Sequence, residues 1–140
     1  MSTNILIKNK LVGAKVIYPE LSYKIVGILF EVHTQLGNRY QEKYYQRAVE
    51  VKLKNKKTDY KREIAVDLTI DGEKIGKYFL DFLIDSKVIL ELKAKPRFTI
   101  NDYRQIRAYL KSKDLKLGIL ANFYGESLEY KRILNSDKLE

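Results

Sequence analysis

Three charged side chains, Asp81, Glu91 and Lys93, interrupt an apolar stretch in the middle of the sequence. Burying a charge inside a sheet costs free energy unless the charge is paired or bound to a metal. Two carboxylates supply the oxygen ligands of a divalent ion, which polarises a phosphoryl group and lowers the pKa of a bound water. A lysine beside them can orient or deprotonate that water, or stabilise the developing charge. Together these residue types indicate a metal site for phosphodiester hydrolysis.

A plainer interpretation of the same residues is an exposed ion pair. Residues two apart on a strand share a face, so Glu91 and Lys93 could neutralise each other on the surface of a sheet. The other residues from 88 to 92 are all apolar, which suits both faces of this segment to a core. These surroundings count against the surface pair, and both interpretations stay open at this point.

The turn between the two acids decides whether they can meet. The sequence predicts strands from Lys74 to Ile84 and from Val88 to Lys93. Asp81 lies opposite Glu91 if the turn consists of the three residues 85–87, whereas a two-residue turn places the carboxylates on opposite faces. A metal site therefore predicts a turn of odd length, or a bulge.

Composition limits the kinds of site that the chain can build. The 140 residues include no cysteine and one histidine, His33, which excludes disulfides, zinc–thiolate centres and multi-histidine metal sites. A bound metal must be held mainly by oxygen, which suits Mg²⁺ or Mn²⁺. With 45% hydrophobic and 32% charged residues, and without repeats or linkers, residues 1–140 are expected to fold as a single domain.

The charge balance points to a polyanionic partner. Lysine and arginine number 27 against 18 acidic residues, and the net charge of +9 favours nucleic acid over a membrane surface or an acidic protein. Solvated surface charge is the plain alternative. The basic residues expected to contact phosphates are Lys54, Lys56, Lys57, Lys61, Arg62, Lys95, Arg97, Arg104 and Arg107.

No segment of the sequence has the character of a membrane span or a signal peptide. No apolar run reaches the ~20 residues that cross a bilayer. Residues 1–15 lack the continuous apolar core and small-residue cleavage site of a secretory signal. We therefore expect a cytoplasmic protein without a membrane partner.

Helical spacing of apolar residues predicts three helices. The first runs from Pro19 to Leu36, the second from about Tyr40 to Asn55, and the third from Ile100 to Lys113 with Thr99 as its cap. The apolar stripe of the first helix is expected to comprise Tyr23, Val26, Leu29, Phe30, His33 and Leu36.

Alternating and continuous apolar segments predict the remaining strands. One runs from Glu63 to Ile70 and turns sharply at an Asp-Gly pair, and a fully buried strand runs from Leu117 to Asn122. Residues 5–7 are expected to form a short edge strand or a docked arm, and the tail from Tyr124 a last partial helix. This order predicts an α/β fold, a mixed central sheet flanked by helices.

These motifs, in this order, resemble the GxxExxY branch of the PD-(D/E)XK nuclease superfamily. Asp-x9-Glu-x-Lys alone is a loose pattern, but a helical Glu upstream and a helical Gln downstream make it more specific. The resemblance extends from residue 17 to residue 134. Its matching segments are Glu31–His33, Leu36–Gly37, Glu42–Tyr45, Gly76–Asp81, Ile89–Ala94, Gln105 with Tyr109–Leu110, and Gly118–Phe123.

The resemblance implies a restriction-endonuclease-like core and a particular set of site residues. By this resemblance the catalytic residues are Glu42, Asp81, Glu91, Lys93 and Gln105. The three acids would bind the metal, Glu42 often through water, and the lysine would be the catalytic lysine. Gln105 would contact the phosphate or orient the lysine, and the backbone carbonyl of Leu92 would be a further ligand.

Three of the candidate residues keep an alternative role. Glu42, in the first turn of a helix, could equally serve as a partner of the helix dipole. Arg39 stands where the glycine that names the GxxExxY motif is expected, so it is either an accessory phosphate contact or a solvated side chain. For His33 the leading interpretation is a buried histidine bonded to a neighbouring carboxylate, and the alternative is a proton shuttle or substrate contact.

The function expected from these observations is Mg²⁺- or Mn²⁺-dependent hydrolysis of phosphodiester bonds, with DNA as the substrate. The alternative is a non-cleaving nucleic-acid-binding or adaptor protein that keeps the nuclease fold. A weaker alternative is a structural protein whose Glu91–Lys93 pair is superficial. By analogy with nucleases of this size, a homodimer would place two sites on two strands.

Overall fold

Three helices and five strands form the part of the chain that the structure, a computed structural model, describes, namely residues 16–135. The expected arm at residues 5–7 lies outside this range. The elements in chain order are α2 Pro19–Leu36, α3 Glu42–Asn55, β1 Tyr60–Ile70, β2 Glu73–Ile84, β3 Val88–Lys93, α4 Ile100–Lys113, β4 Leu117–Asn122 and β5 Glu129–Leu134.

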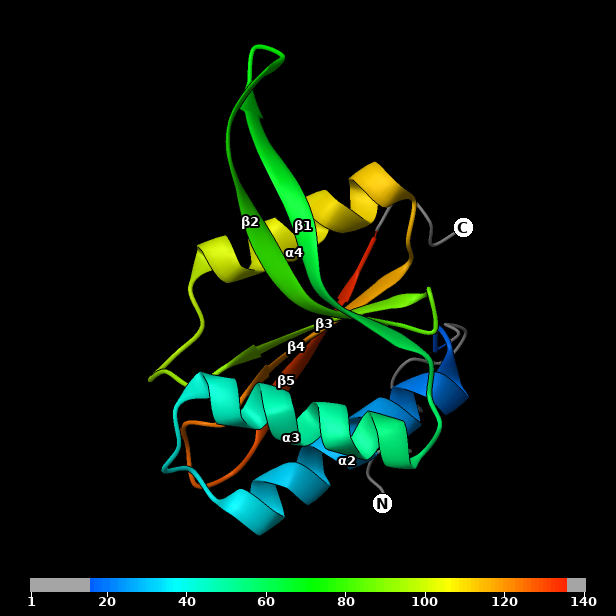
Figure 1. The fold of residues 1–140 in the computed structure, drawn as a ribbon, viewed down its shortest axis with the longest axis vertical. Coiled ribbons are helices and arrows are strands. Elements are labelled where there is room, and N and C mark those ends of the chain that lie inside the picture. The colour runs from blue at the N-terminus through cyan, green and yellow to red at the C-terminus, as the bar shows by residue number, and fades with distance from the viewer. Residues whose placement is uncertain (1–15, 136–140) are drawn as a thin grey trace.

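The strands form one mixed sheet in the order β1-β2-β3-β4-β5. Neighbouring strands are antiparallel except β3 and β4, which run parallel and are joined through α4. Parallel neighbours need a crossover of this kind, since no tight turn can join them. The long β1–β2 hairpin projects beyond the body of the sheet (Figure 1). The predicted α/β fold with a mixed sheet flanked by helices is confirmed.

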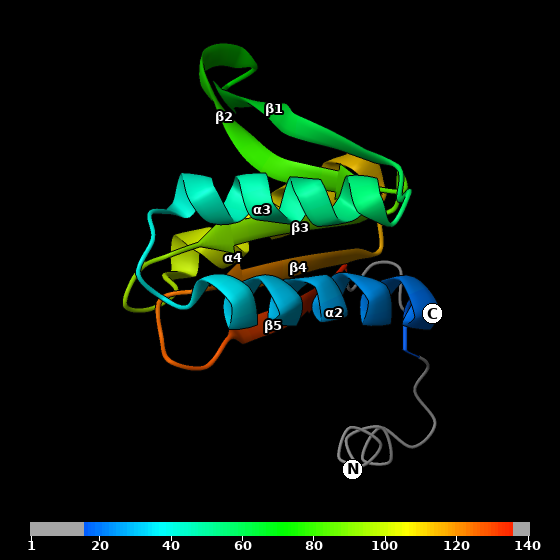
Figure 2. The ribbon, with the colours of Figure 1, turned by 60° about the horizontal axis from the view of Figure 1, so that its bottom comes forward.

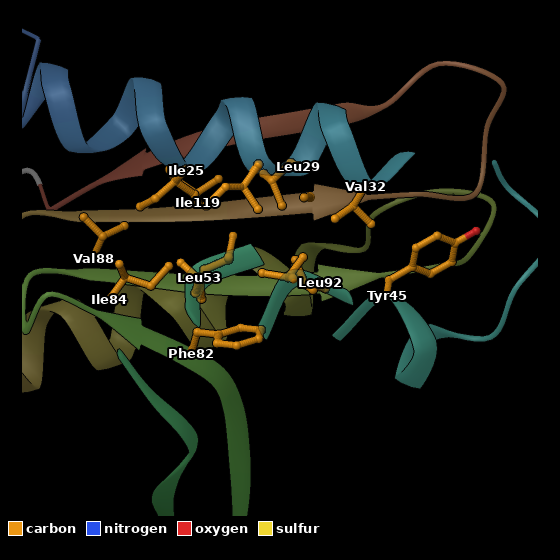
Figure 3. Packing of buried hydrophobic residues seen from close by; sticks show 14 of the residues in the cluster. Ile25, Leu29, Val32, Tyr45, Leu53, Phe82, Ile84, Val88, Leu92 and Ile119 are labelled. Atoms are coloured by element: carbon orange, nitrogen blue, oxygen red, sulfur yellow. The ribbon is translucent and has the colours of Figure 1, made fainter. Parts of the chain in front are cut away.

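Helices cover both faces of the sheet. Helices α2 and α3 lie side by side on one face, and α4 lies on the other (Figure 2). The α2 and α3 side holds the larger apolar cluster (Figure 3). Within this cluster Tyr45 stacks on Phe123 with ring centres 4.4 Å apart. The α4 side holds a smaller cluster built around Ile89, Ile106 and Leu120. Within residues 16–135, no helix combines the length and apolar character that crossing a membrane requires.

The turn between β2 and β3 has the predicted odd length. Ile84 pairs with Val88, so residues 85–87 make a three-residue turn. The left-handed backbone of Asp85 and Ser86, with φ of 54° at both, closes it. The pairing continues to Phe82 and Leu90. Asp81 and Glu91 are the next residue on each strand, and they lie opposite each other where the ladder ends.

Strand β1 carries a local distortion opposite Asp81. Glu63 adopts the left-handed conformation with φ of 54°, which is unusual for a non-glycine residue inside a strand. The pairing of β1 with β2 skips this residue and resumes at Ile64 and Leu80. Leu80 packs into the α4-side cluster, whereas Phe82, two residues later, packs into the α2 and α3 side. The strand pair therefore twists sharply at Glu63 and Asp81, so that residues two apart on β2 pack on opposite faces of the sheet.

Two expectations about the local structure are wrong. Tyr23 and Phe30 of α2 are 84% and 47% exposed, and the helix buries Ile25, Ile28 and Val32 beside the predicted Leu29. Apolar residues surround so much of this helix that spacing alone does not choose the buried face. The tail forms strand β5 rather than a helix, because pairing with β4 satisfies an edge that would otherwise be open.

The contact between α4 and β4 leaves no room for a side chain at Gly118. A Cβ there would lie 2.5 Å from Cγ2 of Ile106. Gly118→Ala should therefore lower the free energy of unfolding by about 1–3 kcal/mol, measured by urea denaturation, as overpacked cores do. Gly76→Ala is the matched control, since nothing lies within 4 Å of its Cβ position. Equal stability of the two variants would contradict the close packing.

Candidate active site

Asp81 and Glu91 join β2 and β3 through their side chains at the point where the backbone ladder ends. The N–H of Asp81 donates to Oε1 of Glu91 at 2.8 Å, and the N–H of Leu92 donates to Oδ2 of Asp81 at 2.7 Å. The two carboxylates thus replace ladder bonds between strands that have begun to separate. The sequence prediction that these acids meet agrees with this geometry.

A single ammonium group, that of Lys93, does not balance the charges of the two carboxylates. Burial raises the pKa of Asp81, although the Leu92 N–H and Lys93 act in the opposite direction. Burial, and then the neighbouring charge of Asp81, raises the pKa of Glu91 to about 8. Like charges at close range disfavour double ionisation, as in other carboxylate pairs. A divalent cation would remove this imbalance.

Lys93 lies among three acids. Its Nζ is 3.4 Å from Oε2 of Glu91 and 3.7 Å from Oδ1 of Asp102. Burial opposes its charge, but Glu91, Glu42 and Asp102 outweigh that effect and raise its pKa above the ordinary value. Only 18% of the side chain is exposed, so its ammonium group faces the acids rather than solvent. The alternative of a superficial Glu91–Lys93 pair does not match this burial.

Glu42 reaches the site from the first turn of α3 through Gln46. Nε2 of Gln46 donates to Oε2 of Glu42 at 3.2 Å and to Oδ1 of Asp81 at 3.0 Å. The two residues are one helical turn apart, and Tyr45 and Val49 anchor that face of α3 in the core. Burial raises the pKa of Glu42. Gln46 was not singled out from the sequence, although its position four residues after a candidate acid was a usable signal.

Asp102, rather than Gln105, is the α4 residue that contacts Lys93. It forms a capping box with Thr99 at the start of the helix, where acids are favoured. Its Oδ2 also receives Nζ of Lys95 at 2.7 Å. Gln105 is partly exposed, and its side chain makes no hydrogen bond within residues 16–135. Sequence reasoning treated Asp102 as a first-turn residue and missed its link to the lysine.

The predicted basic residues fall into two groups. The exposed cations Arg97, Arg104 and Arg107 lie after β3 and on α4, the elements that carry Lys93 and Asp102. Lys54 lies in the last turn of α3, about 18 Å from Glu42 by helix rise. Lys56 and Lys57 follow that helix, and Lys61 lies at the start of β1.

Three of the predicted cations have acidic partners inside the fold. Arg62 pairs with Glu50 at 2.9 Å, Lys56 with Glu31 at 3.9 Å, and Lys95 with Asp102. These pairs leave less of their charge available to a phosphate backbone.

His33 and Arg39 lie at the edge of the site region. Nε2 of His33 is 2.9 Å from the backbone oxygen of Gly125, so its partner is a carbonyl and not the expected carboxylate. The partly exposed ring also lies 5.9 Å from that of Phe123, which indicates a role in holding the neighbouring loop. Arg39 is exposed, in the loop before α3.

The carboxylate oxygens of these acids are ligands that a divalent ion prefers. The present positions of the acids do not form a complete set of metal ligands. Among residues 16–135, no three acidic or histidine side chains come together as a ready-made metal site. Mg²⁺ commonly uses one or two carboxylates and keeps several waters, so Asp81 and Glu91 could suffice. Their shared deficit of positive charge is the observation that supports such a fit.

Comparison with known proteins identifies relatives of this fold. A family model described as the PD-(D/E)XK nuclease superfamily matches residues 19–133. The chain is also similar to the solved protein titled "Crystal structure of SSO0001", at 20% identity and a TM-score of 0.51 over 66% of this chain. This chain matches half of that protein's length, 50%, and the likeness shows the fold alone. A search of the curated proteins gives no match.

Removing one of the paired charges should change the pH dependence of stability. Because the pKa of Glu91 is raised, its contribution to folding is present below the ordinary pKa and is lost as the pH rises through about 8. In EDTA, the melting temperature of Glu91→Gln minus that of the wild type should therefore increase by roughly 5 °C between pH 5 and pH 8.5. Differential scanning fluorimetry measures this difference.

The matched control for this experiment is Glu73→Gln, which removes an exposed acid from β2. Its difference from the wild type should stay constant over the same pH range. A constant difference for Glu91→Gln as well would contradict the charge deficit at the pair.

Proposed function

The chain belongs to the PD-(D/E)XK nuclease superfamily, and from this premise we propose that it is a Mg²⁺- or Mn²⁺-dependent nuclease that cuts DNA. The observation that carries the proposal is the meeting of Asp81 and Glu91 beside Lys93, at the carboxyl end of β3. A carboxylate pair whose charge a single lysine does not balance matches the needs of phosphodiester hydrolysis. We further propose that the chain falls in the GxxExxY branch, although Arg39 replaces its glycine.

Asp81 and Glu91 would hold the divalent ion, together with the backbone carbonyl of Leu92, and Glu42 would contribute through water. When bound, the ion supplies Lewis-acid polarisation of the phosphoryl group. Gln46 links Glu42 to Asp81 and orients both, because one amide donates to both carboxylates. These side chains come from α3, β2 and β3, so the site depends on the packing of all three.

Lys93 would contact the attacking water and the charge that develops on the phosphate. The water oxygen forms a bond to phosphorus and gives up one proton to solvent, the bond from phosphorus to one sugar oxygen breaks, and that oxygen takes up a proton from solvent. Asp102 holds the amine from the α4 side, opposite Glu91. Arg97, Arg104 and Arg107 would bind flanking phosphates. A homodimer that presents two such sites remains part of this proposal.

A second candidate function is nucleic-acid binding without cleavage. The observation that favours it is the missing three-acid cluster within residues 16–135. In such a protein the bonds from Asp81 and Glu91 to backbone N–H groups would be permanent structural links between strands. The basic surface would then carry the function alone.

The cleavage assay separates these two candidates. Purified protein with Mg²⁺ or Mn²⁺ should cut labelled DNA, and Asp81→Ala and Lys93→Ala should each lower the rate at least ~100-fold, since each removes a group that acts in the transition state. Lys93→Ala should still bind DNA in a mobility-shift assay. Binding without cleavage by the wild type, with either metal, would contradict the nuclease and favour the second candidate.

Asp102 should act on the rate through the position of Lys93. Asp102→Asn should lower kcat about 10-fold with little change in KM, as the loss of residues that support a catalytic group does. Thr99→Ala is the matched control, because it breaks the other half of the same capping box without touching the lysine. Equal kcat values for the two variants, at equal melting temperature, would reduce Asp102 to a helix cap.

A further inference from the structure

A cavity of about 260 Å³ opens directly beside Asp81, between α3 and the β1–β2 hairpin. Its wall consists of Gln46, Arg62, Glu63, Phe79, Leu80 and Asp81. We propose that this cavity receives one unstacked base, that of a nucleotide next to the phosphate held at Asp81. The proposal rests on the proposed function, because Asp81 must face the phosphate, and it defines the substrate as DNA with an unpaired nucleotide at this position.

The size of the cavity suits one ring system. Sites for small molecules commonly have volumes of roughly 300–1,000 Å³, and this cavity lies just below that range. A duplex cannot enter a space of this size. A base that enters must therefore leave its stack, which costs least in single strands, flaps and frayed ends.

Phe79 gives the cavity an aromatic wall. The ring is 53% exposed, although a phenylalanine side chain is usually buried. Nζ of Lys77 lies 5.9 Å from the ring centre and adds positive charge at the rim. Exposed aromatic rings flanked by cations are the surfaces on which proteins stack the bases of single strands.

Arg62 gives the cavity a fixed polar wall. It pairs with Glu50, which also accepts the hydroxyl of Tyr60 at 2.6 Å, and its guanidinium lies 4.8 Å from the ring centre of Phe82. The guanidinium nitrogens are hydrogen-bond donors, and nucleobases carry ring nitrogens and carbonyl oxygens that accept hydrogen bonds.

The distortion of β1 makes the space. Glu63 leaves the β conformation opposite Asp81, and the ladder between β1 and β2 is interrupted at this pair. Backbone in rarely populated regions persists where the surrounding structure imposes it, and such residues gather at ligand sites. The carboxylate of Glu63 in the wall disfavours a phosphate there, so a base rather than the backbone of the strand fits the cavity.

A single tryptophan can report on this site, because the chain contains none. Phe79→Trp, placed in the Lys93→Ala background to prevent cleavage, is titrated in Mg²⁺ with single-stranded oligothymidylate and with an abasic strand of the same length. The base-bearing strand should quench the tryptophan strongly, and the abasic strand should leave it nearly unchanged. Ile75→Trp in the same background is the matched control, exposed on the same hairpin outside the cavity.

Affinity provides the second measurement. Phe79→Ala should weaken the binding of oligothymidylate about 5- to 100-fold and leave that of the abasic strand unchanged. Equal quenching by both strands, equal quenching at position 75, no quenching, or no binding of either strand would each overturn the proposal. Base-dependent quenching, together with no cleavage by the wild type, would overturn the proposed nuclease but keep the base-binding cavity, and cleavage by the wild type without base-dependent quenching would do the reverse.

Discussion

The fold depends on two carboxylates, the buried Glu91 and the partly buried Asp81, that bridge strands where their backbones separate. Asp81 and Glu91 each accept a backbone N–H of the opposite strand, so β2 can leave β3 without exposing unpaired groups. The same two hydrogen bonds hold both carboxylates side by side between the strands. Stability and chemistry thus compete at one point, because the arrangement that satisfies the backbone sets two like charges beside a single ammonium group, that of Lys93.

The surrounding elements respond to that constraint. Helix α3 adds Gln46, which donates to two of the acids, and α4 adds Asp102, which holds Lys93 from the side opposite Glu91. Strand β1 turns over at Glu63 and opens the cavity beside Asp81. Each of these contributions joins a segment distant in sequence to the same pair. The site is therefore a meeting point of three layers rather than a property of the hairpin alone.

Sequence reasoning could predict what depends on local chemistry. The turn parity at residues 85–87 follows from the period of a strand, and the bounds of β3, α4 and β4 follow from apolar patterning and the Thr99 cap. It could not predict strand β5, because its partner β4 lies elsewhere in the chain. For the same reason the exposed side of α2, the carbonyl partner of His33 and the contact between Asp102 and Lys93 came only from tertiary packing.

The proposed nuclease function depends on the binding of a divalent cation by the pair Asp81 and Glu91. A crystal of the protein grown with Mn²⁺, with the ion located by its anomalous scattering, tests this binding. We expect a peak in direct coordination with oxygens of both carboxylates, and with Lys93 beside it. A structure in which both acids keep their bonds to the backbone and no manganese lies between them would rule out metal binding by the pair.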